Sequence, residues 1–324
     1  MPSRLSFMLL AIAAAWRTLL NRWRGRKRHP SWSAAQESAV ELLTRNGSVL
    51  CSLPPERARS RMDAVALPPR ARGVKTEPVS IGGAPGRWFI PEGAPADAAL
   101  IYAHGGSFVI GSVHGYAELL ARLAAATRLR VLAFDYRLAP EHRFPAALED
   151  TLAVAGASGI APHRMLLAGD SAGGNLALAA ALELTRRGLR PAGAILLSPW
   201  VDLTASRPSV ERNARFDWGG RGYLLHWISQ YLPAHVSPAD PRASPLYADL
   251  TGLPPLQIHA GTAELLHDEV VELAGRARAA GVEVELHEWP AMVHGWTLLP
   301  GVFPAARETL RACAAFASRC LDGA

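Results

Sequence analysis

Residues 165–174 read MLLAGDSAGG, an apolar run that leads into a serine between small residues. The run predicts a strand buried on both faces of a sheet, and the alanine-rich residues 172–187 predict a helix. The five residues from Gly169 to Gly173 have the spacing G-x-S-x-G. At a sharp strand-to-helix bend, only small flanking residues let the chain pass close to itself, and the bend exposes the serine hydroxyl. We therefore predict that Ser171 is a nucleophile. A nucleotide-binding turn is disfavoured because G-x-G-x-x-G is absent.

Short β-rich runs alternate with alanine-rich helical stretches on both sides of this segment. Strands are predicted at residues 78–81, 87–90, 99–103, 130–134, 165–168, 194–197, 256–259 and 282–287. Helices are predicted at residues 116–127, 145–157, 172–187, 268–280 and 305–320. This rhythm indicates an α/β fold with a mostly parallel, eight-stranded sheet flanked by helices.

Two regions interrupt the alternation. Residues 1–70 are helical where they are periodic, and residues 205–250 form an insertion rich in proline and aromatic residues, including Trp218, Tyr223, Trp227 and Tyr231. An aromatic insertion at this place favours a cap over a site. We predict a catalytic domain over residues 71–324 that carries the 205–250 insertion, with residues 1–70 as a helical arm that completes the cap.

A second motif follows the predicted strand at residues 99–103 and reads His104-Gly105-Gly106-Ser107. When a serine attacks a carbonyl, an oxyanion forms and needs rigid backbone N–H donors. Gly105 and Gly106 can offer such donors without a side chain in the way, and Ala172 can offer another directly after the nucleophile. We predict these three residues as the oxyanion hole, and His104 as a structural residue of the loop.

The base and the acid are expected late in the chain, in the order serine, acid, histidine. His294 lies in a loop after the last predicted strand and is the predicted base. Glu264 lies in the loop after the strand at residues 256–259, and we favour it as the acid that orients His294. Asp268 is the alternative, although it also suits a helix N-terminus.

The net charge of +6 resides in one segment. Residues 1–30 hold seven basic side chains and no acidic one, whereas the remainder is nearly neutral, with 27 basic and 28 acidic residues. A nucleic-acid-binding face is therefore not predicted for the body of the protein. The three cysteines have no metal-ligand spacing and form no even-numbered disulfide framework, which favours reduced thiols in a cytoplasmic protein.

The N-terminal arm combines the apolar run LSFMLLAIAAAW at residues 5–16 with basic residues up to position 28. About twelve apolar residues fall short of the ~20 that span a bilayer. A signal peptide would place its charges before the apolar run, whereas here most of them follow it. Two interpretations are favoured over a true anchor or signal. Residues 5–28 could contact an anionic membrane peripherally, or they could form a helix packed over the mouth of the site. A homodimer is compatible with the sequence and is not predicted by any pattern in it.

These motifs resemble those of the hormone-sensitive-lipase-like bacterial esterases of the α/β-hydrolase fold. The resemblance rests on HGGSFVIGS at 104–112, DYRLAPEHRFPAALED at 135–150, GDSAGGNLA at 169–177, SPWVDL at 198–203 and WPAMVHGW at 289–296. It implies hydrolysis of short- to medium-chain acyl esters without a metal or organic cofactor. Two positions depart from the family pattern: Glu264 replaces the usual aspartate, and Ser107 replaces a third glycine.

Two other functions use the same residues differently. An amidase or another acyl hydrolase would share the acyl-enzyme and differ only in its leaving group. A non-catalytic ligand-binding protein of this fold would be expected to have lost a member of the Ser171, Glu264 and His294 set, which is complete here.

Overall fold

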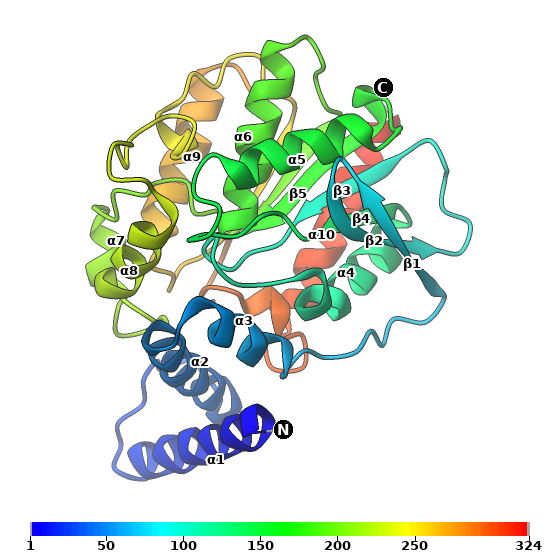
Figure 1. Ribbon diagram of the computed structural model, residues 1–324. Helices are drawn as coiled ribbons and strands as arrows, with labels where there is room; N and C mark the ends of the chain where they lie inside the picture. The colour runs from blue at the N-terminus through cyan, green and yellow to red at the C-terminus, as the bar shows by residue number, and fades with distance from the viewer. Residues whose placement is uncertain (1, 323–324) are drawn as a thin grey trace.

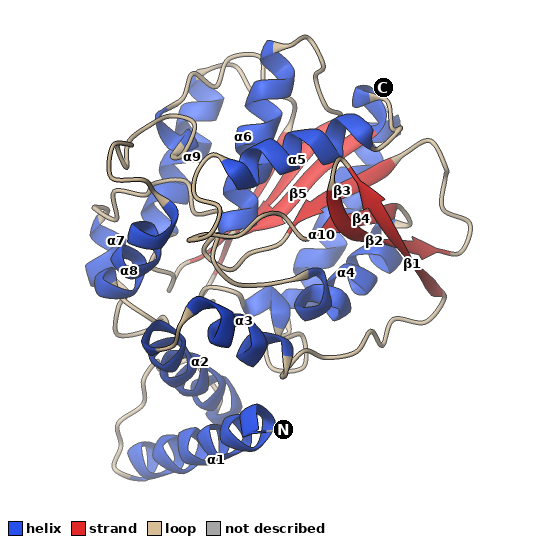
Figure 2. Cartoon of the chain, viewed as in Figure 1, coloured by secondary structure: helices blue, strands red, loops and turns tan. Residues whose placement is uncertain are grey.

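The computed structural model describes residues 2–322, with side chains from Leu5 onward, and contains one eight-stranded sheet (Figures 1 and 2). The spatial order is β1-β2-β4-β3-β5-β6-β7-β8. β1 and β2 form an antiparallel hairpin, β2 pairs antiparallel with β4, and all other neighbours are parallel. The predicted α/β sheet is thereby confirmed. The strands are β1 Val74–Ile81, β2 Ala84–Pro91, β3 Ala99–Ala103, β4 Arg130–Phe134, β5 Met165–Asp170, β6 Gly193–Leu197, β7 Leu256–Gly261 and β8 Val284–Trp289.

Helices cover both faces of the sheet. On one face, α5 (Ala146–Ala157), α6 (Ala172–Arg186) and α9 (His267–Ala279) share an apolar core with Ile101 of β3. On the other face, α4 (Val113–Thr127) and α10 (Ala305–Asp322) share a second core with Leu100 of the same strand. Because successive side chains of a strand point to opposite faces, β3 must be apolar throughout. All five of its residues are buried.

Two elements have ends that differ from the predicted ones for visible reasons. α4 begins at Val113, three residues before the predicted start, because the Ser112 hydroxyl accepts the Gly115 N–H and caps the helix. β8 begins at Val284 instead of residue 282, because the Val282 N–H donates to Ala277 O and still belongs to the end of α9.

The N-terminal helices and the insertion lie together at one end of the molecule (Figure 1). α1 (Pro2–Trp23) packs on α2 (Ala34–Ser52), and α3 (Pro55–Asp63) follows. The insertion contributes α7 (Pro208–Arg212), α8 (Arg221–Tyr231) and the short turn η2 (Pro245–Tyr247). The remaining 3₁₀ turns are η1 (Pro162–Arg164) and η3 (Trp296–Leu298). No helix within residues 2–322 has the length and the hydrophobicity required to cross a membrane.

Arg28 joins the N-terminal helices to the insertion. Its Nε donates to Arg215 O at 2.9 Å, and its Nη2 donates to Asp217 O at 2.8 Å. Its backbone N–H donates to Glu37 Oε1 of α2. One basic residue of the arm therefore holds two segments that are almost 190 positions apart in sequence.

The turn between β5 and α6 is the tightest approach of backbone to backbone in the sheet's centre. A Cβ added at Gly173 would lie well under 3.0 Å from Ala103 O of β3, and one at Gly169 would overlap the Gly173 backbone. Both glycines are required because no side chain fits there.

We expect Gly173→Ala to destabilise the protein by about 3 kcal/mol, since the added methyl group must displace backbone on β3. Gly156→Ala is the matched control: it lies in α5, an added Cβ meets nothing within 4 Å, and the change should leave stability the same or raise it by up to ~1 kcal/mol. Urea unfolding curves of the two variants measure the difference. Equal midpoints would contradict the proposed backbone contact.

Candidate active site

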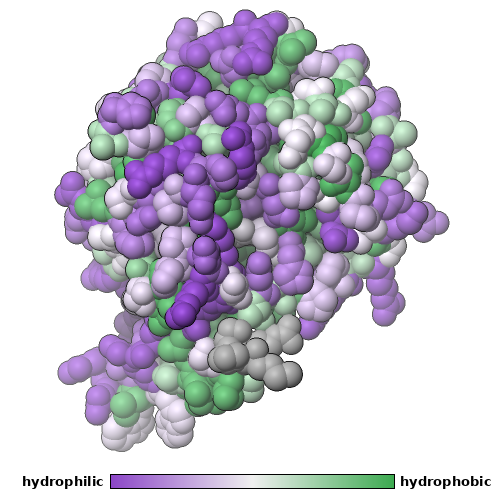
Figure 3. Space-filling model, in the orientation of Figure 1, coloured by the Kyte–Doolittle hydropathy of each residue, from purple (hydrophilic) through white to green (hydrophobic). Residues whose placement is uncertain are grey.

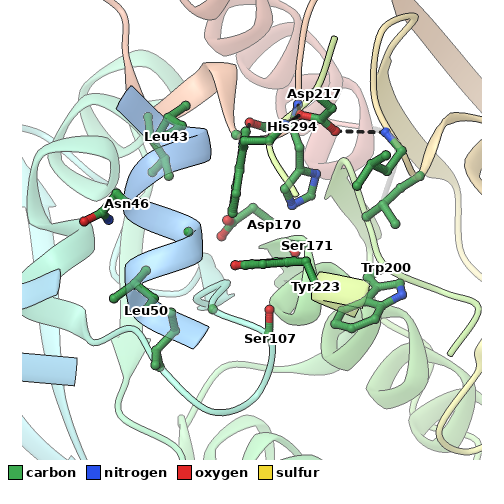
Figure 4. Close-up of a pocket in the computed structure, with 18 of the residues that line it drawn as sticks. Leu43, Asn46, Leu50, Ser107, Asp170, Ser171, Trp200, Asp217, Tyr223 and His294 are labelled. Atoms are coloured by element: carbon green, nitrogen blue, oxygen red, sulfur yellow. Dashed lines mark hydrogen bonds between the residues drawn. The ribbon is translucent and has the colours of Figure 1, made fainter. Parts of the chain in front are cut away.

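Ser171 lies at the turn between β5 and α6 with φ +53° and ψ −121°. Residues with a side chain rarely adopt a positive φ, so surrounding bonds must hold this conformation. The Ser171 N–H donates to Leu197 O at 3.0 Å, and its carbonyl accepts the N–H groups of Trp200 and Asn175. The backbone of Ser171 is thereby fixed, while its hydroxyl points into a cavity (Figure 4).

His294 and Glu264 meet beside that cavity. His294 Nδ1 and Glu264 Oε2 are 3.1 Å apart, and the imidazole of His294 and the hydroxyl of Ser171 enter the same space (Figure 4). Glu264 is fully buried, and its other oxygen, Oε1, accepts the Ser198 hydroxyl at 2.7 Å and the Gly261 N–H at 2.6 Å. A buried carboxylate with both oxygens engaged is a rigid partner for an imidazole.

The surroundings of His294 favour its protonated form. Burial alone lowers the pKa of His294, but the hydrogen bond and negative charge of Glu264 and the charges of Asp217 and Asp170 outweigh burial. The pKa of His294 is therefore raised above its usual 6.5. Such a group can take up a proton during a reaction and hold it as an imidazolium.

Asp268, the alternative acid, is engaged elsewhere. It forms an ion pair with Arg212 and accepts the Ser209 N–H at 2.9 Å. Burial raises the pKa of Asp268, but the hydrogen bond from Arg212 and several smaller effects outweigh burial. The pKa of Asp268 is therefore below its usual value. Asp268 is the second residue of α9, beside the insertion, and makes no hydrogen bond with His294 among the described residues.

The oxyanion loop agrees with only part of the prediction. The Gly105 N–H donates to Asp170 Oδ1 at 2.8 Å, so the predicted role as an oxyanion donor does not fit Gly105. Gly106, with φ +122°, and Ser107, with φ +55°, line the cavity, as does Ile110 further along the same loop. Ala172 follows Ser171 at the first position of α6, where helix N–H groups lack intrahelical acceptors. From the sequence, Ser107 was noted only as a replacement for a third glycine, and its N–H was not considered as a donor.

Asp170 explains why the loop takes this path. It is buried, and it accepts hydrogen bonds from the hydroxyls of Tyr102 at 2.8 Å and Tyr116 at 2.9 Å as well as from Gly105. Burial raises the pKa of Asp170, and these three donors oppose that rise. The predicted structural role of His104 agrees with its place, since it is buried and stacked on Tyr136 at 4.3 Å between ring centres.

Asp217 is a residue of this site that sequence reasoning missed. Its Oδ1 accepts the His294 N–H at 3.0 Å, and its Oδ2 accepts the Leu265 N–H at 2.9 Å (Figure 4). Its neighbour Trp218 donates its indole N–H to His294 O at 2.7 Å. Asp217 therefore connects the histidine loop to the acid loop from the insertion. No motif marks it, because it is one acidic residue between aromatic residues.

Burial also perturbs Asp217 itself. Desolvation raises its pKa to about 6, with Glu264 adding to the rise and His294 opposing it. Asp170, Asp217 and Glu264 together raise the pKa of His294.

The cavity over Ser171 is mostly apolar. Its volume is about 120 Å³, which is small beside the ~300–1,000 Å³ typical of sites for drug-sized ligands. α2 and the insertion each supply four of its lining residues, so the two regions predicted as a cap meet here (Figure 4). The apolar lining residues are Leu43, Leu50, Met62, Ile110, Trp200, Trp218, Leu224, Leu265, Leu266 and Leu298.

Comparison with known proteins gives a consistent picture. Residues 100–298 match the model of a family described as alpha/beta hydrolase fold. An acetyl-hydrolase of Streptomyces hygroscopicus is 38% identical over 280 residues, covering 84% of this chain and 91% of that protein. An esterase of Acinetobacter venetianus is 35% identical over 288 residues, covering 87% of this chain and 94% of the other.

Solved structures agree with these sequence relatives. An esterase from the bacterial hormone-sensitive lipase family superposes with a TM-score of 0.79 at 35% identity, covering 86% of this chain and 98% of that one. A hormone-sensitive lipase from a metagenome library superposes with a TM-score of 0.81 at 36% identity, covering 88% and 98%.

We expect Asp217→Asn to lower kcat for ester hydrolysis by about tenfold or more, with a smaller effect on KM. An amide has one acceptor oxygen, so its NH₂ group would face either the His294 or the Leu265 N–H, and the imidazole would lose its position. The general base must be neutral, so kcat/KM should fall as pH drops through the pKa of His294, which lies above 6.5. Removing the Asp217 charge should move that midpoint to lower pH.

A pH profile of kcat/KM measures this shift. Asp249→Asn is the matched control, because Asp249 is an exposed residue of the same insertion that bonds only its local turn at Thr251. An unchanged midpoint and kcat for Asp217→Asn would show that the contact does not position His294.

Proposed function

Because this chain belongs to the α/β-hydrolase family, among its hormone-sensitive-lipase-like esterases, and is a carboxylic ester hydrolase, we propose that it acts through an acyl-enzyme on Ser171. The observation that carries the proposal is the buried Glu264–His294 pair at 3.1 Å beside the strained Ser171 turn. An imidazole oriented by a buried carboxylate and facing a serine hydroxyl is the arrangement that nucleophilic acyl transfer requires.

In the first half of the reaction, Ser171 Oγ attacks the acyl carbon and its proton passes to His294 Nε2. Glu264 accepts a hydrogen bond at Nδ1, which keeps Nε2 free to act as the base and stabilises the imidazolium that forms. The negative charge of Asp217 adds to this stabilisation and raises the pKa of His294.

The carbonyl oxygen becomes negatively charged in the tetrahedral intermediate. We assign three donors to this oxyanion: the N–H groups of Gly106, Ser107 and Ala172. Ser107 replaces Gly105 in this set, because the Gly105 N–H already binds Asp170. Loss of one such donor typically costs about 10²–10³ in rate. The Gly105 N–H contributes indirectly, because its bond to Asp170 holds the loop in place.

The ester C–O bond then breaks, and His294 gives its proton to the departing alcohol. Water enters, loses a proton to His294, and its oxygen attacks the acyl carbon of the acyl-enzyme. The bond between Ser171 Oγ and the acyl carbon then breaks, His294 returns its proton to Oγ, and the carboxylic acid is released. No redox step or added group is needed for these bonds to balance.

The apolar cavity supports short- to medium-chain acyl groups. The cavity is lined by Leu43, Gly47 and Leu50 of α2 and by Tyr223 and Leu224 of the insertion. These side chains offer apolar contact to an alkyl chain and few polar partners, whereas a charged acyl group would lose its hydration without compensation.

We expect Ser171→Ala to lower esterase activity to less than a tenth of the wild-type rate, and in practice by several orders of magnitude. Alanine removes only Oγ and keeps the backbone bonds of the turn, so circular dichroism and the unfolding midpoint should be unchanged. Hydrolysis of p-nitrophenyl butyrate and labelling by a fluorophosphonate give the two readouts. Activity above a tenth of wild type in a folded variant rules out Ser171 as the nucleophile.

A paired substitution separates the two carboxylates. Glu264→Ala should reduce kcat by about 10³ or more, because it removes the partner of His294 Nδ1. Asp268→Ala should cost much less activity, because it breaks contacts with Arg212 and Ser209 that lie away from the imidazole. Steady-state rates of the two folded variants decide between them, and a larger loss for Asp268→Ala would give that residue the acid role.

A further inference from the structure

α1 exposes its large apolar side chains to solvent along a single face. Their spacing of three or four residues places them on one side of the helix. Their exposed fractions range from 43% to 83%, with Trp23 the most exposed. In Figure 3, hydrophobic groups gather at the lower end of the molecule, where Figure 1 places α1. This outward face consists of Leu5, Met8, Leu9, Ile12, Trp16, Leu19, Leu20 and Trp23.

The opposite side of α1 packs on the protein through small and polar groups and through the half-buried Phe7 and Leu10. Ala14 and Thr18 are buried, and Arg22 forms an ion pair with Glu37 of α2 at 3.1 Å. Arg22 also donates to Trp32 O at 3.0 Å. A helix on the surface of a globular protein normally turns its widest apolar stripe to the core. In α1 the widest apolar stripe points to solvent instead, and the ion pairs of Arg17 and Arg22 with α2 hold the helix in this orientation.

Positive charge adjoins this face. Arg24, Arg26 and Lys27 directly follow α1, are exposed, and pair with no carboxylate among the described residues. Residues 1–30 contain no acidic side chain. A second copy of α1 would bring only like charges to the contact, whereas anionic lipid headgroups would neutralise them.

We propose that the outward face of α1, with the basic residues that follow it, binds the surface of an anionic lipid bilayer. Aromatic and aliphatic side chains enter the boundary between headgroups and acyl chains, and Arg24, Arg26 and Lys27 contact the headgroups. The proposal does not depend on the acyl-enzyme assignment, because it concerns a surface outside the cavity.

The bilayer contact lies one helix away from the substrate. α1 packs on α2, and Arg61 connects the two helices by donating to Ser6 Oγ at 2.9 Å and to Asn46 Oδ1 at 2.8 Å. Asn46 lines the cavity over Ser171 (Figure 4). An enzyme held in this way works beside the phase into which apolar esters partition.

Sedimentation of the full-length protein with sucrose-loaded vesicles tests the proposal. We expect binding to phosphatidylcholine vesicles that contain phosphatidylglycerol, much weaker binding to phosphatidylcholine alone, and loss of binding as salt is added. The triple variant Arg24→Gln, Arg26→Gln, Lys27→Gln should weaken partitioning on the order of 100-fold. The triple variant Leu5→Gln, Leu9→Gln, Leu20→Gln should weaken it at least about tenfold, while glutamine preserves helix propensity.

Leu189→Gln is the matched control, since Leu189 is 45% exposed and lies far from α1 in the sequence, and it should bind like wild type. Circular dichroism and hydrolysis of a water-soluble ester identify any variant that has failed to fold, and the wild-type comparison of the two vesicle types stands without variants. Absence of binding to anionic vesicles, or equal binding to both types, overturns the proposal. So does a lipid-free dimer that the leucine variant dissociates, because a second copy would then cover the face.

Discussion

The structure depends on the close contact between the β5–α6 turn and the end of β3. Gly173 leaves no room for a side chain beside Ala103 O, and Gly169 leaves none beside Gly173. This contact sets where the helix begins, and the resulting bend holds Ser171 at a positive φ with its backbone fully bonded. The bend therefore has two consequences: the Ser171 hydroxyl is held in a cavity, and the start of α6 lies close against the end of β3.

Three buried carboxylates organise the loops around that hydroxyl. Asp170 binds the loop after β3, Glu264 bridges the end of β6 to the end of β7, and Asp217 connects the insertion to the loops after β7 and after β8. A buried charge is tolerated only when donors surround it, and each of these carboxylates meets three or more. The same negative charges raise the pKa of His294. The three carboxylates therefore both hold the loops in place and increase the affinity of His294 for a proton.

The N-terminal helices connect this centre to the surface. α2 forms part of the cavity wall, Arg28 holds the arm against the insertion at Asp217 O, and α1 lies outside α2 with its apolar side outward. The segment that carries Asp217 is therefore supported from one side by the histidine loop and from the other by the arm.

Local pattern was sufficient for most of the fold and indicated the residues proposed for the core of the site. Apolar runs, glycine spacing and chain order indicated the eight strands, Ser171, Glu264 and His294, because those features depend on backbone sterics and on side-chain types that sequence displays directly. Sequence did not reveal that Asp170 occupies the Gly105 N–H, or that Asp217 supports His294 across 77 positions. Only the folded chain decides such contacts. A carboxylate accepts hydrogen bonds from whichever donors lie near it in space, and this choice leaves no periodic pattern or fixed spacing in the sequence.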